Sequence, residues 1–227
     1  IDPATPFFVF DGLRRAMPGV QFINGSSVTA SCRMHKSDNE IALIQFAMDL
    51  TLEVQKSVAR ILEPGISTID VQEFLTDAHL KLGTDGPPAF RIVLFGEPTA
   101  YPHGVPYPQE LKEGDMVLID TGATIDGYYS DITRSYVFGE PTARQRQVWD
   151  LEKAAQAAAF EAAQIGAPAE TVDKAARDVI EDAGFGPGYK VPGLAHRTGH
   201  GIGLDIHEEP YIVPGNVTPL APGMCFS

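Results

Sequence analysis

Apolar side chains recur at roughly helical spacing through the first third of the chain. The spacing predicts a long helix over residues 37–62, because Ser37 and Glu40 make a capping box at its start and Pro64-Gly65 stops it. A second helix is predicted over residues 68–82. The two helices are close in sequence, so we expect them to pack as a pair.

The same order of elements then repeats. A β-rich block over residues 90–138 follows the first pair, and two more helices are predicted over about 142–165 and 170–183. Residues 190–227 return to strand-like sequence punctuated by glycine and proline. Residues 1–36 contain a helix-like piece, "FFVFDGLRRAMPG", and a strand-like piece, "VQFING". They are too short for a domain and are expected to be the tail of an upstream one.

The two halves resemble each other at a fixed offset of 101 residues. Matched positions are Gly65 and Gly166, Val71 and Val172, and Gly83 and Gly184. Two unrelated helix pairs could share such stop signals, which is the alternative reading. Together with the repeated element order, the matches indicate an internal duplication. We therefore predict an α+β fold of two pseudo-symmetric halves, with the site between them.

The segment "GDMVLIDTGATIDGYYSDITRSYVFG" predicts a hairpin that turns at Asp126-Gly127. A two-residue loop pairs Asp120 with Thr133, which puts Asp120 and Asp131 on one face as diagonal neighbours, roughly 7–8 Å apart. Burying an unpaired Asp120 within "MVLID" would be costly, unless a metal, a proton or a buried arginine offsets the charge. Arg134 is predicted to point to the other face. The alternative is two exposed acids on an edge hairpin.

The stretch "HRTGHGIGLDIHEEP" contributes three more candidates, His196, His200 and His207. Its glycines argue against a zinc-binding helix, and in an extended chain His196 and His200 share one face. Glu208 and Glu209 are candidate bases or ligands, although a charged turn ended by Pro210 is the favoured interpretation. A further histidine, His103, lies in the loop sequence "AYPHGVPYP". Imidazole with carboxylates suits Mn, Co, Zn or Fe better than Ca.

The composition of the chain excludes some classes of binding partner. The net charge of −13 argues against nucleic acid and anionic membrane surfaces. Apolar runs are too short to span a bilayer, and no leader is visible in a chain that begins at Ile1. Cys32 and Cys225 do not form a disulfide framework, which fits a reducing compartment. We expect a cytoplasmic protein without nucleic-acid or membrane partners.

Four motifs together resemble the pita-bread metallopeptidases, the family of methionine aminopeptidase, aminopeptidase P and Xaa-Pro dipeptidase (prolidase). The motifs are "HG" at 103–104, "IDTGATIDGYYSDITR" at 119–134, "HRTGHGIGLDIHEEP" at 196–210 and "GMCFS" at 223–227. In addition, "RMHKSDNE" at 33–40 resembles the start of the catalytic domain in prolidase and aminopeptidase P.

The resemblance implies a domain organisation. It implies a pita-bread fold over residues 37–227, with 1–36 as the remnant of an N-terminal creatinase-like domain and its linker. It also implies two glutamate ligands after "GMCFS", so we expect the catalytic domain to be incomplete at its C-terminus. The chain then carries three of five metal ligands.

The same resemblance implies site roles. Asp120 would ligate one divalent metal ion, Asp131 would bridge two, and His200 would ligate the other, with Mn favoured and Co, Zn or Fe possible. His103 and His207 match histidines that face the substrate and stabilise the tetrahedral intermediate or assist proton transfer. His196 matches a position that lines the pocket. The two cations would supply the hydroxide that attacks the scissile carbonyl.

The implied activity is cleavage of X-Pro peptide bonds, by a dipeptidase or an aminopeptidase, in a homodimer. Two alternatives remain open. One is a non-peptidase enzyme on the same fold, such as a metal-dependent small-molecule lyase, because that activity would keep the metal ligands. The other is a binding module with a relict site, although relatives of that kind typically lose ligands.

Overall fold

The computed structural model describes residues 1–2, 4–102 and 104–227. The helices are α1 (Phe7–Ala16), α2 (Ser26–Met34), α3 (Asp38–Ile61), α4 (Thr68–Lys81), the 3₁₀ helix η1 (Glu97–Ala100), α5 (Ala143–Ala162) and α6 (Ala169–Asp182). The strands are β1 (Phe90–Phe95), β2 (Met116–Gly122), β3 (Thr124–Ile125), β4 (Tyr128–Tyr129), β5 (Ile132–Val137), β6 (Gly199–Gly201) and β7 (Glu208–Ile212). The four long helices, α3 to α6, confirm the helices predicted from sequence.

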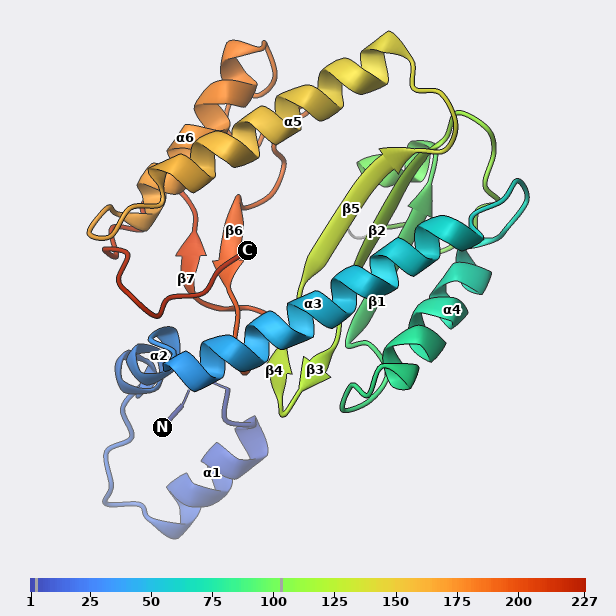
Figure 1. The fold of residues 1–227 in the computed structure, drawn as a ribbon. Coiled ribbons are helices and arrows are strands. Elements are labelled where there is room, and N and C mark those ends of the chain that lie inside the picture. Colours follow the sequence, from blue (N-terminus) through green and yellow to red (C-terminus); the bar gives the residue numbers. More distant parts are fainter. Residues whose placement is uncertain (3, 103) are drawn as a thin grey trace.

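The first half is a three-stranded antiparallel sheet, ordered β1-β2-β5, that α3 and α4 cover on one face (Figure 1). The capping box at Ser37 and Glu40 starts α3 as predicted, with both reciprocal hydrogen bonds present. Alternate β2 residues, Val117 and Ile119, are fully buried against the two helices. The intervening residues, Asp120 among them, therefore face the opposite side of the sheet.

The second half repeats this plan with α5, α6 and the antiparallel pair β6-β7. Its small core joins Ala169 and Val172 of α6 to Ile212 of β7 and Leu220. Backbone bonds at the two helix joints correspond. They are Gly65 N–H to Leu111 O and Gly166 N–H to Leu220 O, at 2.8 and 2.7 Å, and Leu111 N–H to Ile66 O and Leu220 N–H to Ala167 O, at 3.0 and 2.9 Å.

The helix-ending glycines correspond as well. Gly65 and Gly166 have φ of 88° and 86°, and Gly83 and Gly184 both have φ of 87°. This left-handed conformation favours glycine, which explains why the glycines mark the repeat in the sequence. The predicted pseudo-two-fold α+β architecture is confirmed.

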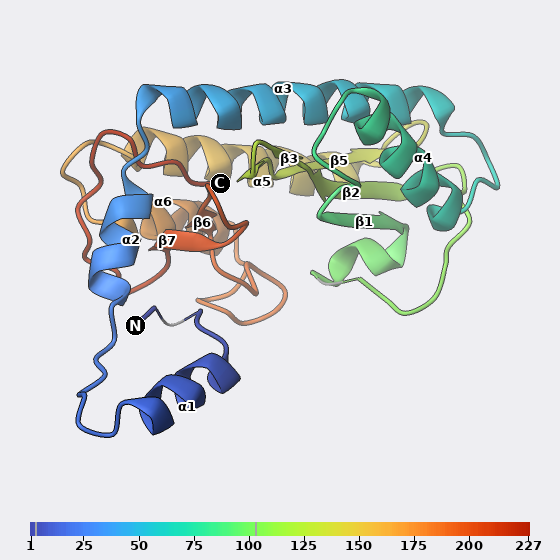
Figure 2. The ribbon, with the colours of Figure 1, turned by 90° about the horizontal axis from the view of Figure 1, so that it is seen from below.

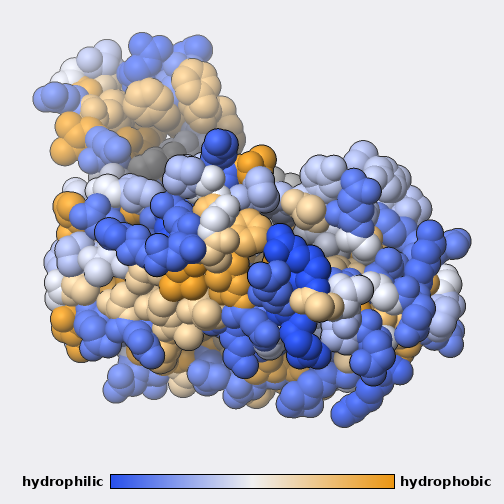
Figure 3. All heavy atoms as spheres, turned by 90° about the horizontal axis from the view of Figure 1, so that it is seen from above, coloured by the Kyte–Doolittle hydropathy of each residue, from blue (hydrophilic) through white to orange (hydrophobic). Residues whose placement is uncertain are grey.

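The N-terminal segment departs from the prediction. The helix-like piece forms α1, but "VQFING" forms no strand, and α2 follows it unpredicted. The segment lacks a partner strand, and Phe22 instead packs edge-on against Phe10 of α1, with ring centroids 5.6 Å apart. Figures 2 and 3 show α1 projecting from the rest of the molecule, with Phe7 and Phe8 each 77% exposed. No helix in the described part of the chain is long and apolar enough to cross a membrane.

Candidate metal centre

The hairpin sets the position of both aspartates. Asp126 and Gly127 have φ of 48° and 80°, so both turn residues are left-handed, as a tight two-residue turn requires. The ladder pairs Asp120 with Thr133, as predicted. On the helix side of the sheet, buried Gln55 of α3 donates its Nε2 hydrogens to the carbonyls of Ile119 and Ile132, at 3.1 and 3.0 Å. These carbonyls precede Asp120 in β2 and follow Asp131 in the chain, so α3 fixes the backbone beneath both carboxylates.

Asp120 is an unsatisfied carboxylate. Its Oδ1 atom is buried and accepts no hydrogen bond from any residue that the structure describes. Burial, and then the charge of Asp131, raise the pKa of Asp120 to about 6. Arg134 does not neutralise it, because the Arg134 guanidinium is exposed and donates to the Thr133 carbonyl at 2.9 Å. A cation beside the Asp120 carboxylate would offset the cost of burying its charge.

His200 lies against Asp131. Its Nε2 atom is 3.2 Å from Asp131 Oδ2, and the side chains are 11% and 14% exposed. His200 Nδ1 lies 3.1 Å from the Gly201 carbonyl oxygen, which orients the ring so that Nε2 points to the carboxylate. Ser227 holds the backbone of His200, since the His200 N–H donates to the Ser227 carbonyl at 3.1 Å and the His200 carbonyl accepts the Ser227 N–H at 2.9 Å. Residues from the two halves therefore meet at Asp131 and His200.

His207 contacts His200 edge-on, with ring centroids 4.3 Å apart and an interplanar angle of 89°. Partial burial, followed by the charges of His200 and Arg197, lowers the pKa of His207. His207 is nevertheless an exposed residue, whereas His200 is buried. A partner molecule can therefore reach His207 while His200 stays buried behind it.

The other candidates have different positions. His196 is exposed in the loop before β6, with Nδ1 2.7 Å from the Arg197 carbonyl oxygen. The predicted strand face shared by His196 and His200 does not form, because β6 begins only at Gly199. His103 lies outside the described residues. The prediction of a charged turn at Glu208 is wrong, because Glu208 is only 8% exposed and is the first residue of β7.

The candidate ligands suit a divalent metal ion chemically. No group of three or more His, Cys, Asp or Glu side chains in the described residues is arranged so that it could hold a metal ion. Asp120, Asp131 and His200 instead meet in pairs. The unpartnered Asp120 Oδ1 and the neighbouring Asp131 charge form a site that a cation would stabilise. Two carboxylates with an imidazole match the donor preference of Mn, Fe, Co or Zn.

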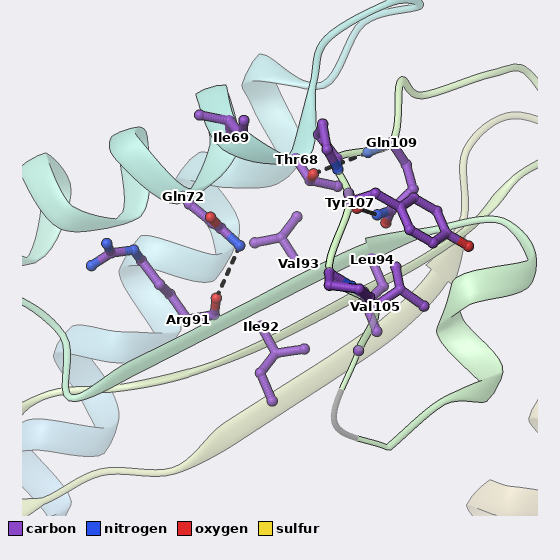
Figure 4. Close-up of a pocket in the computed structure, with 13 residues that line it drawn as sticks. Thr68, Ile69, Gln72, Arg91, Ile92, Val93, Leu94, Val105, Tyr107 and Gln109 are labelled. Carbon is purple, nitrogen blue, oxygen red and sulfur yellow. Dashed lines mark hydrogen bonds between the residues drawn. The ribbon is translucent and has the colours of Figure 1, made fainter.

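A separate pocket of about 280 Å³ lies between α4, β1 and the loop at 104–109 (Figure 4). Gln72 of α4 donates to the Arg91 carbonyl at 3.3 Å along one side of it. The candidate ligands do not line this pocket. Ile92 does, and Ile92 pairs with Asp120 in the β1-β2 ladder, so the pocket adjoins the face that carries Asp120.

Sequence comparison gives consistent matches. The model of metallopeptidase family M24 matches residues 42–227. A probable dipeptidase PepE of Mycobacterium tuberculosis is 42% identical over 210 residues, 92% of this chain and 54% of the relative. A Xaa-Pro dipeptidase of Lactobacillus helveticus is 36% identical over 221 residues, 95% of this chain and 58% of the relative. The chain thus spans little more than half the length of these relatives.

Solved structures agree with the fold. A prolidase from Thermococcus sibiricus superposes with a TM-score of 0.90 at 34% identity, covering 100% of this chain and 60% of that one. The dipeptidase PepE from Mycobacterium ulcerans also gives 0.90, at 38% identity, covering 99% of this chain and 59% of that one. The antiparallel sheet, its helix pair and the second half are therefore a known arrangement.

Proposed function

Because the chain belongs to metallopeptidase family M24, we propose that it forms the greater part of the catalytic unit of a metal-dependent exopeptidase that cleaves X-Pro peptide bonds. The main support is the contact of Asp131 from the first half with His200 from the second, beside Asp120, whose buried Oδ1 has no partner among the described residues. Relatives named Xaa-Pro dipeptidase and prolidase support the substrate class.

The proposed division of labour follows from burial and position. Asp120, Asp131 and the Nε2 atom of His200 would hold divalent cations, which when bound supply a hydroxide nucleophile near neutral pH and polarise the scissile carbonyl. His207 lies in front of His200 and would donate a hydrogen bond to the oxyanion that develops on that carbonyl. Gln55 keeps the strands beneath the two aspartates in register. We retain His103 as a substrate-facing residue and His196 as a pocket residue, as hypotheses from the family resemblance.

The repeat suggests where a further ligand belongs. In the first half Asp120 comes six positions after Gly114, which has φ of 85°. Beyond the helix pairs the backbone bonds match Leu111 with Leu220, so the glycine that matches Gly114 is Gly223, three residues after Leu220, with φ of 84°. The place that corresponds to Asp120 is two positions beyond Ser227, in a part of the family that this chain does not span. We propose that a carboxylate there, with a second one further on, completes the site.

Manganese is the proposed metal, with cobalt, zinc or iron as the other choices that the ligands allow. We also propose that the protein is a cytoplasmic homodimer, with residues 1–36 as the remnant of an N-terminal creatinase-like domain and its linker. Both cysteines, Cys32 and Cys225, are free thiols, which is consistent with a reducing compartment.

The test uses the complete protein, stripped of metal and then assayed with and without Mn²⁺. Substrates are X-Pro dipeptides, X-Pro-Y peptides and matched X-Ala peptides. We expect metal-dependent release of proline or of the amino-terminal residue from X-Pro substrates, with X-Ala peptides cleaved poorly. Absence of metal-dependent cleavage of every X-Pro peptide would reject the proposal and favour a lyase or a binding module.

A further inference from the structure

A buried ion network lies behind the loop that carries His207. Glu208, the first residue of β7, is 8% exposed, and its Oε1 atom lies 2.5 Å from Nζ of Lys36, whose side chain is 2% exposed. Its Oε2 atom accepts from Nη2 and Nε of Arg33, at 2.6 and 3.2 Å. Both carboxylate oxygens are thus bound by cations, one from the last turn of α2 and one from the segment that joins α2 to α3. Glu208 is consequently unavailable as a metal ligand or a general base.

The loop at 203–207 is built around this carboxylate. Asp205 accepts a second bond from Arg33 Nη2, at 2.7 Å, and its own N–H points to Glu208 Oε2 at 3.4 Å. At Gly203, an added Cβ would come within 2.5 Å of Glu208 Oε1 and 2.7 Å of Lys36 Cε. The Gly203 carbonyl accepts the N–H of Tyr129 at 2.9 Å, which ties the loop to the metal-site hairpin.

The first turn of α3 reaches the hairpin as well. Glu40 accepts a hydrogen bond from the Tyr128 hydroxyl at 2.6 Å. The Lys36 N–H donates to the Gly223 carbonyl at 2.8 Å. The sequence "RMHKSDNE" at 33–40 therefore contacts both halves of the site through three of its polar side chains, those of Arg33, Lys36 and Glu40.

We propose that Glu208, held by Lys36 and Arg33, is a positioning residue that fixes His207 against His200. Glu208 is the first residue of β7 and directly follows His207, so anchoring its side chain fixes the backbone at the end of the bend that carries His207. Two charged donors hold a carboxylate more rigidly than one neutral hydrogen bond does. The inference deepens the proposed function and depends on it for its catalytic consequence.

The first test compares Glu208→Gln with Glu209→Gln in the complete, Mn²⁺-loaded protein. Glu209 is the matched control, because among the described residues its side chain accepts a hydrogen bond from the Tyr211 N–H alone, at 3.1 Å, and forms no ion pair with Arg33 or Lys36. We expect E208Q to lower kcat by about 10- to 100-fold with little change in KM, as small misplacements of reacting groups do. E209Q is expected to leave both parameters within about twofold of the wild type.

A double mutant separates positioning from general destabilisation. If Glu208 acts through His207, E208Q in a His207→Ala background should cost no more than about threefold further in kcat. An equal loss in both backgrounds would overturn the proposal. Lys36→Met is a second variant in case E208Q folds poorly. Since Arg33 still holds Glu208, K36M should give a smaller kcat loss that likewise disappears in the H207A background.

The last test does not depend on activity. Imidazole ¹⁵N–¹H correlations of the metal-free complete protein report the ring environments of His200 and His207. We expect E208Q to shift the His207 signals and weaken the cross-peaks between the two rings, whereas E209Q leaves them unchanged. Unchanged His207 signals in E208Q would overturn the positioning role, even in an active enzyme. Conversely, perturbed signals in a protein that cleaves no X-Pro peptide would support the positioning role and reject the proposed function.

Discussion

Arg177 of α6 organises the loop that leads to His200, and its replacement should be among the most damaging single changes in the second half. Its Nε lies 3.0 Å from both oxygens of Asp173, and the two side chains are 8% and 2% exposed. Its remaining donors bond the carbonyls of Gly188, Leu194 and His196, at 2.7, 3.0 and 2.8 Å. Asp173 in turn accepts from the Thr198 hydroxyl at 2.6 Å, two residues before His200.

Arg177→Met removes this guanidinium and leaves the Asp173 carboxylate buried without its cation. Breaking a buried ion pair from one side costs about 3–5 kcal/mol. For a domain of this size, that free energy lowers Tm by about 6–20 °C. The loop around Gly188 and Leu194 should also open to protease, because it loses the bonds that fold it onto α6.

The control lies on the same helix. Lys174 and Asp178 form an ion pair with the same spacing in sequence, but their side chains are 71% and 54% exposed. Lys174→Met should leave the urea midpoint nearly unchanged, because water screens this exposed pair. Urea unfolding followed by far-ultraviolet circular dichroism measures both variants, and limited proteolysis measures the loop. Equal losses for R177M and K174M would refute the reasoning that burial decides the strength of these pairs.

Three further predictions concern the stability of two other sites and the metal binding of the 227-residue chain. Gly203→Ala should lower the free energy of unfolding in urea by about 1–3 kcal/mol, because the added Cβ meets Glu208 and Lys36. The control is Gly86→Ala, whose Cβ meets nothing within 4 Å and which should be nearly neutral. Equal losses for the two variants would contradict the crowding at Gly203. Glu40→Gln should lower stability at pH 7 by about 1 kcal/mol. The Tyr128 hydroxyl and the helix cap lower the pKa of Glu40 from 4.5 to about 2, so its stabilisation is present above pH 4.5 and is lost as the pH falls toward 2. The difference in free energy of unfolding between wild type and E40Q should therefore disappear as the pH falls over that range. A difference that stays constant would show that the ionised form of Glu40 is not the stabilising one. Calorimetric titration of the 227-residue chain with Mn²⁺ should show no tight binding of two ions, since it carries three of the five ligands expected; a clean two-to-one stoichiometry would contradict that count.

The hairpin was predictable because its determinants are local. A two-residue turn at Asp126-Gly127 fixes the register of every pair beyond it, so the partner of Asp120 follows from counting. The helix ends were predictable for a similar reason, since Gly65 and Gly166 occupy left-handed positions that other residues adopt at a cost.

Non-local contacts were not predictable in this way. Glu208 looks like an ordinary surface acid beside Glu209 and Pro210, and only the approach of Lys36, 172 positions earlier in the chain, gives it a buried role. The motif "RMHKSDNE" at 33–40 was the one feature of the sequence that pointed to this region. The sequence did not show which acidic residues its Arg33 and Lys36 would bind. The piece at 20–25 has strand-like composition, yet it forms no strand, because β structure requires a partner strand.

The most direct test of the central claim is an anomalous difference map from crystals of the complete protein soaked in Mn²⁺ and measured near the manganese absorption edge. We expect peaks within bonding distance of the carboxylates of Asp120 and Asp131 and of Nε2 of His200, with none of these peaks in crystals of Asp131→Asn. Peaks at other residues, or unchanged peaks in the D131N crystals, would contradict the claim.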